Sequence, residues 1–233
     1  MTAIAIPDLR ESVLRALDTV RDPELDEPVT TLGFVASCSA TEGSVEVHLR
    51  LPTYFCAPNF AFLMVADAFD AVRAVAGVDH AVIVLDDHFA ADAINAGVAA
   101  RAGFVGTFGS EASGELDALR ADFVRKAVLA GTDRVCRPLI TRGVDVFGLT
   151  LGDVPPSSEL DTLRARRAEV GLPAHDAAPL LIDVATGERL AEQDLSLHLA
   201  RARLSRVGVE ANVGICRGML AHRYGSGDNT EET

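Results

Sequence analysis

The sequence has no tryptophan and few basic residues, and these shortages exclude several classes of partner. Its 21 basic side chains face 34 acidic ones, for a formal net charge of -13. Because phosphate backbones and anionic lipid surfaces are attracted by positive charge, we expect neither nucleic-acid nor membrane binding. No apolar run reaches the roughly 18 residues of a membrane span, and residues 1–12 lack the pattern of a signal peptide. We therefore expect a cytoplasmic protein.

Cysteine is also scarce. The four cysteines, Cys38, Cys56, Cys136 and Cys216, lie far apart and form no C-x-x-C motif. This spacing indicates neither a disulfide framework nor a zinc knuckle, so any metal site would have to be assembled by folding. Hydrophobic residues make up 48% of the chain, which is enough for a substantial core.

The first hundred residues predict a compact α+β module. Residues 7–20 place apolar side chains on one helical face, and residues 29–40 form a β-rich run. Residues 44–51 alternate strictly between apolar and polar side chains, which is typical of a half-buried strand. A helical pattern over 59–75 and a buried strand running into acidic residues complete the order helix, strand, strand, helix, strand.

The rest of the chain predicts a mainly helical extension. Helical periodicity covers residues 115–130 and 160–170, and a last helix is expected within EANVGICRGMLAHRY, residues 210–224. The glycine-rich GFVGTFGS, residues 103–110, lacks the pattern of a phosphate-binding loop and is interpreted as a flexible connector. We expect domains at 1–100 and 101–224, followed by a disordered acidic tail at 225–233.

The stretch RLPTYFCAPNF, residues 50–60, places a thiol between a strand and a helix. Pro52 ends the strand because it cannot donate to the ladder, and Pro58 lies where a helix would start. Cys56 therefore lies near a helix N-terminus, where the dipole and free amide groups favour a thiolate that can bind metal. The alternative is a small structural thiol in a tight turn, as free cysteine often is.

Other candidate ligands lie after the last strand and in the extension. Asp86, Asp87 and His88 offer two carboxylates and an imidazole, which suit a metal or a partner contact. The favoured alternative is an exposed acidic turn that caps the next helix. Cys136 and Cys216 are further candidate ligands, but their apolar, arginine-flanked settings favour packing.

Three segments together resemble the PaaD/SufT-like family of iron–sulfur cluster assembly proteins. They are VRDPELDEPVTTLGFV, VHLRLPTYFCAP and AVAGVDHAVIVL, and the resemblance runs from about Leu9 to Leu85. The matched positions are Asp22 to Leu25, Leu32 to Val35, Cys56, and Gly77 with Val78. One departure is Ala57, which separates Cys56 from Pro58 where the family has cysteine followed directly by proline.

The resemblance implies transient binding of iron or an iron–sulfur cluster for a metalloenzyme client, without catalysis. Cys56 would supply a thiolate, and Asp22 and Glu24 would supply carboxylates for ferrous iron. The two acids are otherwise explained as solvated residues of a helix-terminating turn.

The long extension is similar to that of accessory proteins of bacterial di-iron monooxygenases, so the implied client is a hydroxylase of that class. Three hypotheses follow: a metal-maturation factor, a metal-free adaptor or assembly chaperone, and an enzyme with a cysteine nucleophile, in that order. We expect no enzyme activity. Whether the protein is a homodimer is left open.

Overall fold

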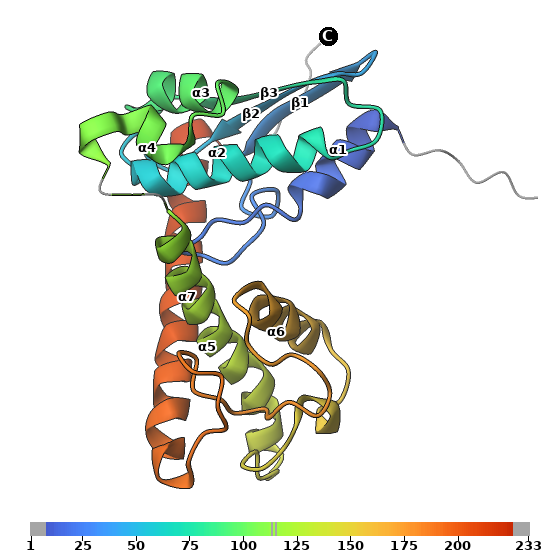
Figure 1. Cartoon of the computed structure of the whole chain (residues 1–233), viewed down its shortest axis with the longest axis vertical. Coiled ribbons are helices and arrows are strands. Elements are labelled where there is room, and N and C mark those ends of the chain that lie inside the picture. The colour runs from blue at the N-terminus through green and yellow to red at the C-terminus, as the bar shows by residue number, and fades with distance from the viewer. Residues whose placement is uncertain (1–7, 113, 115, 226–233) are drawn as a thin grey trace, which may run out of the picture. The chain divides into compact units, whose positions relative to one another are not determined.

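The computed structural model describes residues 8–112, 114 and 116–225, and it confirms the predicted α+β class. The first part follows the predicted order: α1 (Leu9–Leu17), β1 (Val35–Thr41), β2 (Ser44–Arg50), α2 (Pro58–Arg73) and β3 (His80–Asp86). Beyond it lie α3 (Ala91–Ala99), α4 (Gly103–Phe108), α5 (Asp117–Thr141), α6 (Ser158–Glu169) and α7 (Leu195–Tyr224), with short 3-10 turns at Gly109–Glu111, Leu151–Asp153 and Glu192–Asp194. Figure 1 shows these elements along the chain.

The packing divides the chain into two compact units, and the first contains the end of the last helix. One unit comprises residues 1–116 and 213–233, and the other comprises residues 117–212. The predicted domain division at residue 100 stays a prediction. The predicted acidic tail falls almost entirely on residues 226–233, which lie outside the described residues.

A three-stranded sheet organises the first unit. β1 pairs antiparallel with β2 through a two-residue turn in which Glu42 and Gly43 both have positive φ, the turn geometry that suits a tight hairpin. β2 pairs in parallel with β3, so α2 is the crossover between them. The ends of β2 and β3 at Arg50 and Asp86 are therefore neighbours at one edge.

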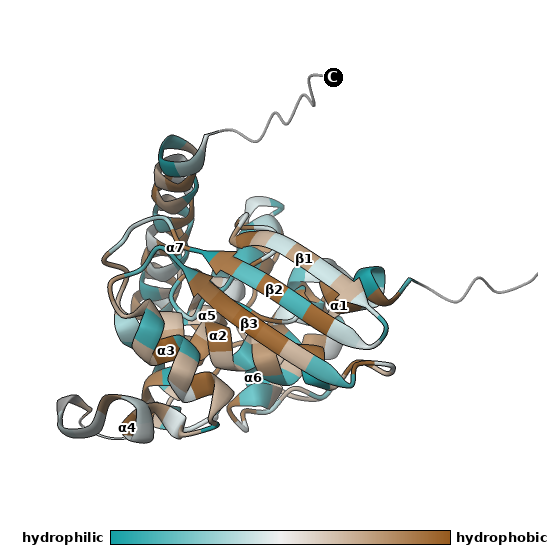
Figure 2. Cartoon of the chain, turned by 90° about the horizontal axis from the view of Figure 1, so that it is seen from above, coloured by the Kyte–Doolittle hydropathy of each residue, from teal (hydrophilic) through white to brown (hydrophobic). Residues whose placement is uncertain are grey.

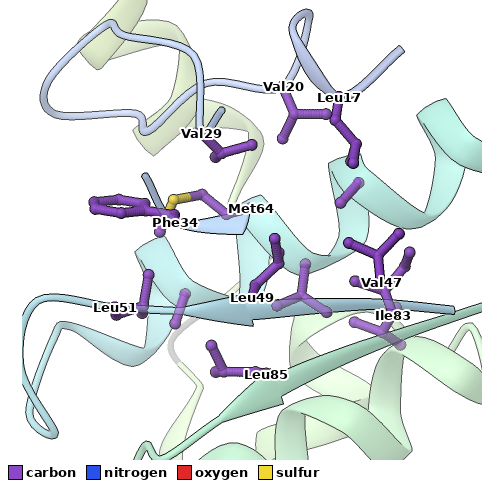
Figure 3. Close-up of a cluster of buried hydrophobic side chains, with 14 of the residues drawn as sticks. Leu17, Val20, Val29, Phe34, Val47, Leu49, Leu51, Met64, Ile83 and Leu85 are labelled. Carbon is purple, nitrogen blue, oxygen red and sulfur yellow. The ribbon is translucent and has the colours of Figure 1, made fainter. Parts of the chain in front are cut away.

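The core of this unit lies between one face of the sheet and the first two helices. Along β2, Val45, Val47 and Leu49 are buried while Glu46 and His48 point to the other face, and Figure 2 shows this alternation of hydropathy. Side chains of α1 and α2 pack against the buried face, as Figure 3 shows for Leu17 and Met64. Such burial of apolar area is the main stabilising contribution.

The end of α7 belongs to this same core. Leu220 is buried in the cluster, and a Cβ atom built on Gly33 would lie 3.2 Å from its Cδ2. Arg217 donates to the carbonyl oxygen of Thr31 at 3.4 Å, and Arg223 donates to that of Leu51 at 3.2 Å. The last three turns of the chain are therefore structural parts of the N-terminal module.

The prediction of a flexible connector at residues 103–110 is wrong, because GFVGTFGS forms α4 and the start of a 3-10 turn. Phe104 and Phe108 are one helical turn apart, and their rings lie 5.5 and 6.4 Å from the ring of Phe62. Two aromatic contacts to a buried residue outweigh the low helix propensity of the glycines.

The second unit is built on α5 and α6 around a buried arginine. Arg167 is fully buried and donates to the carbonyl oxygens of Pro173, Pro179 and Leu180. Burial lowers the pKa of its guanidinium to about 10. The irregular segment after α6 is thus held to the helix by one cation that satisfies several buried carbonyls.

Candidate functional site

The turn between β2 and α2 presents Cys56 at the edge where β2 ends. Pro58 occupies the first turn of α2, where its missing N–H costs no helical hydrogen bond, and Ala57 is the N-cap. The inserted alanine therefore places the thiol one residue before the cap. The Sγ atom of Cys56 lies 3.2 Å from Oγ1 of Thr53, and the side chain is half-buried. The cysteine is thus accessible and held by its own turn.

His88 ties this turn to the loop after β3. The imidazole is buried, its Nδ1 accepts a hydrogen bond from the amide of Ala90 at 3.2 Å, and its Nε2 lies 2.7 Å from the carbonyl oxygen of Cys56. With Nδ1 accepting, Nε2 carries the proton and donates to that carbonyl. Burial lowers the pKa of His88, which favours this neutral form. Both ring nitrogens are therefore engaged away from the thiol.

Three exposed aromatic residues flank the thiol. The rings of Tyr54 and Phe55 are 5.0 Å apart, and the ring of Phe89 lies 5.9 Å from that of Phe55. Phe55 is 76% exposed, which is unusual for a side chain of this size. The amide of Phe89 donates to the carbonyl oxygen of Tyr54 at 3.1 Å, so the cluster bridges the two loops. In the sequence, the only sign of this cluster is the pair Tyr54 and Phe55 directly before Cys56, because Phe89 joins it only through folding.

Asp22 and Glu24 occupy a turn after α1, and they differ in accessibility. Asp22 is 8% exposed, and its Oδ1 accepts hydrogen bonds from the amides of Glu24 and Leu25 at 2.9 and 2.8 Å. Burial raises the pKa of Asp22 against the lowering effect of those two hydrogen bonds. Glu24 is exposed. Asp22 therefore organises the turn, and Glu24 is the more accessible carboxylate.

The side chains of Asp86, Asp87 and His88 do not converge on a common site, because each has a different partner. Asp86 accepts from Nδ1 of His48 at 3.0 Å on the open face of the sheet. Asp87 pairs with Arg223 at 2.5 Å and accepts from the hydroxyl of Tyr224 at 3.2 Å. Asp86 therefore links β3 to β2 through His48, and Asp87 binds the end of α7. His88 instead binds the backbone of the turn that contains Cys56.

Cys216 on α7 lies near the predicted ligands, although its sequence setting favoured packing alone. It is half-buried and packs against the core of the first unit. Burial and the neighbouring negative charges of Asp22, Cys56 and Glu24 raise its pKa to about 11. In the sequence, the feature that indicates this packing is the spacing of Val213, Cys216 and Leu220, which places all three on one helical face.

The other two cysteines lie elsewhere. Cys136 is fully buried in the second unit, where burial raises its pKa to about 12. Cys38 lies on β1, and burial also raises its pKa. Across residues 8–112, 114 and 116–225, no three His, Cys, Asp or Glu side chains stand close enough together to hold a metal ion.

Comparison with known proteins places one family over the first part of the chain. Residues 10–84 match the family model described as iron–sulfur cluster assembly protein. This range contains Asp22, Glu24 and Cys56 but ends before Asp86, and Cys216 lies far beyond it. No curated protein and no solved structure matches the chain. Within the part of the chain that the structure describes, no helix is long and apolar enough to cross a membrane.

Proposed function

We propose that this chain is a maturation factor that takes up iron or an iron–sulfur cluster transiently at Cys56 and delivers it to a metalloenzyme. The single observation that carries the proposal is the family match over residues 10–84, which brings an iron–sulfur assembly function to the module that displays this thiol. Iron is the cargo here, and the protein's task is to hold and release it.

The chemistry of the available donors fits such a cargo. A half-exposed thiol suits iron and iron–sulfur clusters, because thiolate is the ligand that these centres prefer. Glu24 is the better placed of the two predicted carboxylates, since one oxygen of Asp22 is already engaged by two backbone amides. We retain Asp22, Glu24 and Cys56 as the proposed ligands, with Asp22 also building the turn.

The proposed client is the hydroxylase of a bacterial multicomponent di-iron monooxygenase. This proposal rests on the sequence resemblance to accessory proteins of those systems, and the family match leaves the chain beyond residue 84 available for such a role. A carboxylate-bridged di-iron centre would require iron insertion and no assembled cluster. The helical second unit, residues 117–212, is then the part available to recognise that client.

A cysteine-nucleophile enzyme is the least supported reading of the site. Such a thiol needs a base within hydrogen-bond reach. The nearby imidazole of His88 donates to the carbonyl of Cys56, and its other nitrogen accepts from Ala90. The proposed role is therefore non-catalytic, in keeping with the family.

The second candidate is a metal-free adaptor or assembly chaperone for the same kind of hydroxylase. The exposed cluster of Tyr54, Phe55 and Phe89 favours it, because exposed aromatic side chains are enriched where proteins bind one another. In that case Cys56 would be a structural part of the turn.

Anaerobic reconstitution with ferrous iron and sulfide separates the two candidates. Iron and acid-labile sulfide are measured after desalting for the parent protein, Cys56→Ser and the control Cys136→Ser. The maturation factor predicts that the parent and the control retain iron and that Cys56→Ser loses most of it. Retained sulfide identifies a cluster, and iron without sulfide identifies a mononuclear or di-iron cargo. If the parent holds no more iron than Cys56→Ser, the adaptor takes its place.

A further inference from the structure

We propose that a cationic cavity in the second unit docks an acidic segment of the protein that receives the cargo. The inference rests on the proposed function, which requires a client and leaves residues 117–212 available to recognise it. It adds the chemistry of the recognised segment, in which carboxylate side chains stand next to apolar ones.

The cavity lies between the end of α5 and the start of α6 and has a volume of about 400 Å³. Its floor is apolar, because it is lined by Val135, Leu139 and Val154, which are buried parts of the core of the second unit. Its rim contains the exposed residues Pro155 and Pro156, so the mouth opens at the surface. Pockets that bind small ligands have volumes of about 300–1,000 Å³, so this one accommodates a few side chains of a docked peptide.

Three arginine side chains line this cavity on a chain whose formal net charge is -13. Arg134 is already paired, since its Nε atom lies 3.8 Å from Oε1 of Glu210. Arg142 donates through Nε to the carbonyl oxygen of Pro138 at 3.0 Å. Among the residues that the structure describes, the guanidinium of Arg137 and the terminal nitrogens of Arg142 make no hydrogen bond or ion pair. Two of the three cations are therefore available to a ligand.

The two carboxylates at the cavity are engaged by other groups. Glu210, which contacts Arg134, also pairs with Arg206 at 2.5 Å. Glu159 accepts a hydrogen bond from the hydroxyl of Ser158 at 3.1 Å in the exposed first turn of α6. The two available guanidiniums thus form a local excess of positive charge, which attracts carboxylate groups and can bind them through charge-assisted hydrogen bonds.

Apolar surface continues beyond the cavity, which favours a protein segment over a small anion. Ile140 and Val144 are 45% and 41% exposed, and they follow Arg137 and Arg142 by three and two residues, respectively. Exposed apolar side chains beside arginine are typical of surfaces that bind other proteins. The partner that fits this surface is therefore an acidic segment that also carries apolar side chains.

Nuclear magnetic resonance of the arginine Nε–Hε groups in the full-length, iron-free protein tests this inference. The probe is the blocked peptide Ala-Glu-Leu-Glu-Ala, and the controls are Ala-Gln-Leu-Gln-Ala and inorganic phosphate. The variants are Arg137→Gln and Arg142→Gln, with Arg125→Gln as the matched control because Arg125 lies on α5 outside the cavity. Circular dichroism melting checks that each variant folds. We expect the acidic peptide to shift the signals of Arg137 and Arg142 saturably, and to bind about tenfold more weakly to either variant but equally well to the control.

The outcomes separate this inference from the function on which it rests, because the titration needs no iron. Equal binding of the acidic and the amide peptide, or no saturable shift at Arg137 and Arg142, overturns the docking site. Phosphate that binds as tightly as the acidic peptide overturns the protein segment in favour of a small anion. A parent that retains iron after reconstitution but does not bind the peptide loses only the docking site. A parent that binds the peptide but holds no iron supports the docking site and leaves the adaptor as the function.

Discussion

The Nε2 atom of His88 donates a hydrogen bond to the carbonyl oxygen of Cys56 across 2.7 Å. The two residues are far apart in sequence, and each follows one of the two parallel strands, β2 and β3. The hydrogen bond therefore locks together the two loops that leave the same edge of the sheet. The buried side chain of His88 therefore fixes the backbone that carries the Cys56 thiol.

Replacing His88 by leucine should loosen the Cys56 turn. The carbonyl oxygen of Cys56 and the amide of Ala90 would both lose their partner, at a cost of about 1–3 kcal/mol in the free energy of unfolding. We also expect faster alkylation of Cys56 by iodoacetamide, quantified on the peptide by mass spectrometry. His80→Leu is the matched control because His80 is exposed. An unchanged alkylation rate in His88→Leu would show that the hydrogen bond does not restrain the turn.

The lowered pKa of His88 predicts a loss of stability in acid. A buried imidazole that stays neutral in the folded protein takes up a proton more readily when unfolded, so stability falls as the pH drops below about 6.5. Denaturant titrations at pH 5.5 and 7.5 should show a larger decrease for the parent than for His88→Leu. Equal decreases would contradict the assignment.

His48 should act in the opposite direction. Its hydrogen bond to Asp86, and a second to Glu46, raise its pKa, so its stabilising effect is complete below about pH 6.5 and is lost as the pH rises through the higher folded value. His48→Gln should therefore cost more free energy of unfolding at pH 5.5 than at pH 9. The difference should stay under about 1 kcal/mol because the pair is partly exposed. A cost that grows with pH would refute this reading.

Gly33 should be required for docking of the last helix. Its φ of +76° disfavours any side chain by about 1–2 kcal/mol, and an added Cβ would press on Leu220. Gly33→Ala should lower the free energy of unfolding by at least that amount. Gly214→Ala is the control, since nothing lies within 4 Å of its added Cβ and it should stabilise the helix by about 0.5–1 kcal/mol. Equal effects of the two substitutions would argue against the contact.

Arg167 should carry much of the stability of the second unit. Arg167→Met keeps the bulk but leaves the buried carbonyls of Pro173, Pro179 and Leu180 without their donor, at a cost of roughly 2–4 kcal/mol. Chemical denaturation measures this loss. Arg203→Met, at an exposed position of α7, should change stability by less than about 0.5 kcal/mol. Similar small effects at both positions would refute the role of the buried cation.

The sequence was most informative where one local pattern decides the structure. Strict alternation along residues 44–50 indicated β2, and Pro58 marked the start of α2, because each depends on neighbours in the chain. The glycine-rich segment at 103–110 was misjudged because its helix depends on contacts of Phe104 and Phe108 with Phe62. Local propensity does not contain that information.

The same distinction applies to the candidate site. The position of Cys56 between a strand and a helix followed from two prolines. The placement of Cys216 against the same module did not, because it arises from the return of α7 to a unit whose N-terminal part ends at residue 116. The sequence also did not indicate that Asp86, Asp87 and His88 have separate partners. Asp87, for example, binds Arg223 and Tyr224, which are distant in the chain.

Iron K-edge X-ray absorption on the protein loaded anaerobically with ferrous iron alone identifies the atoms that are bonded to the cargo. Without sulfide, any sulfur neighbour must come from a cysteine. If Cys56 binds the cargo, iron has sulfur neighbours in the parent and in Cys136→Ser, and clearly fewer of them in Cys56→Ser. Iron that has only oxygen or nitrogen neighbours in the parent, or the same number of sulfur neighbours in Cys56→Ser, would contradict it.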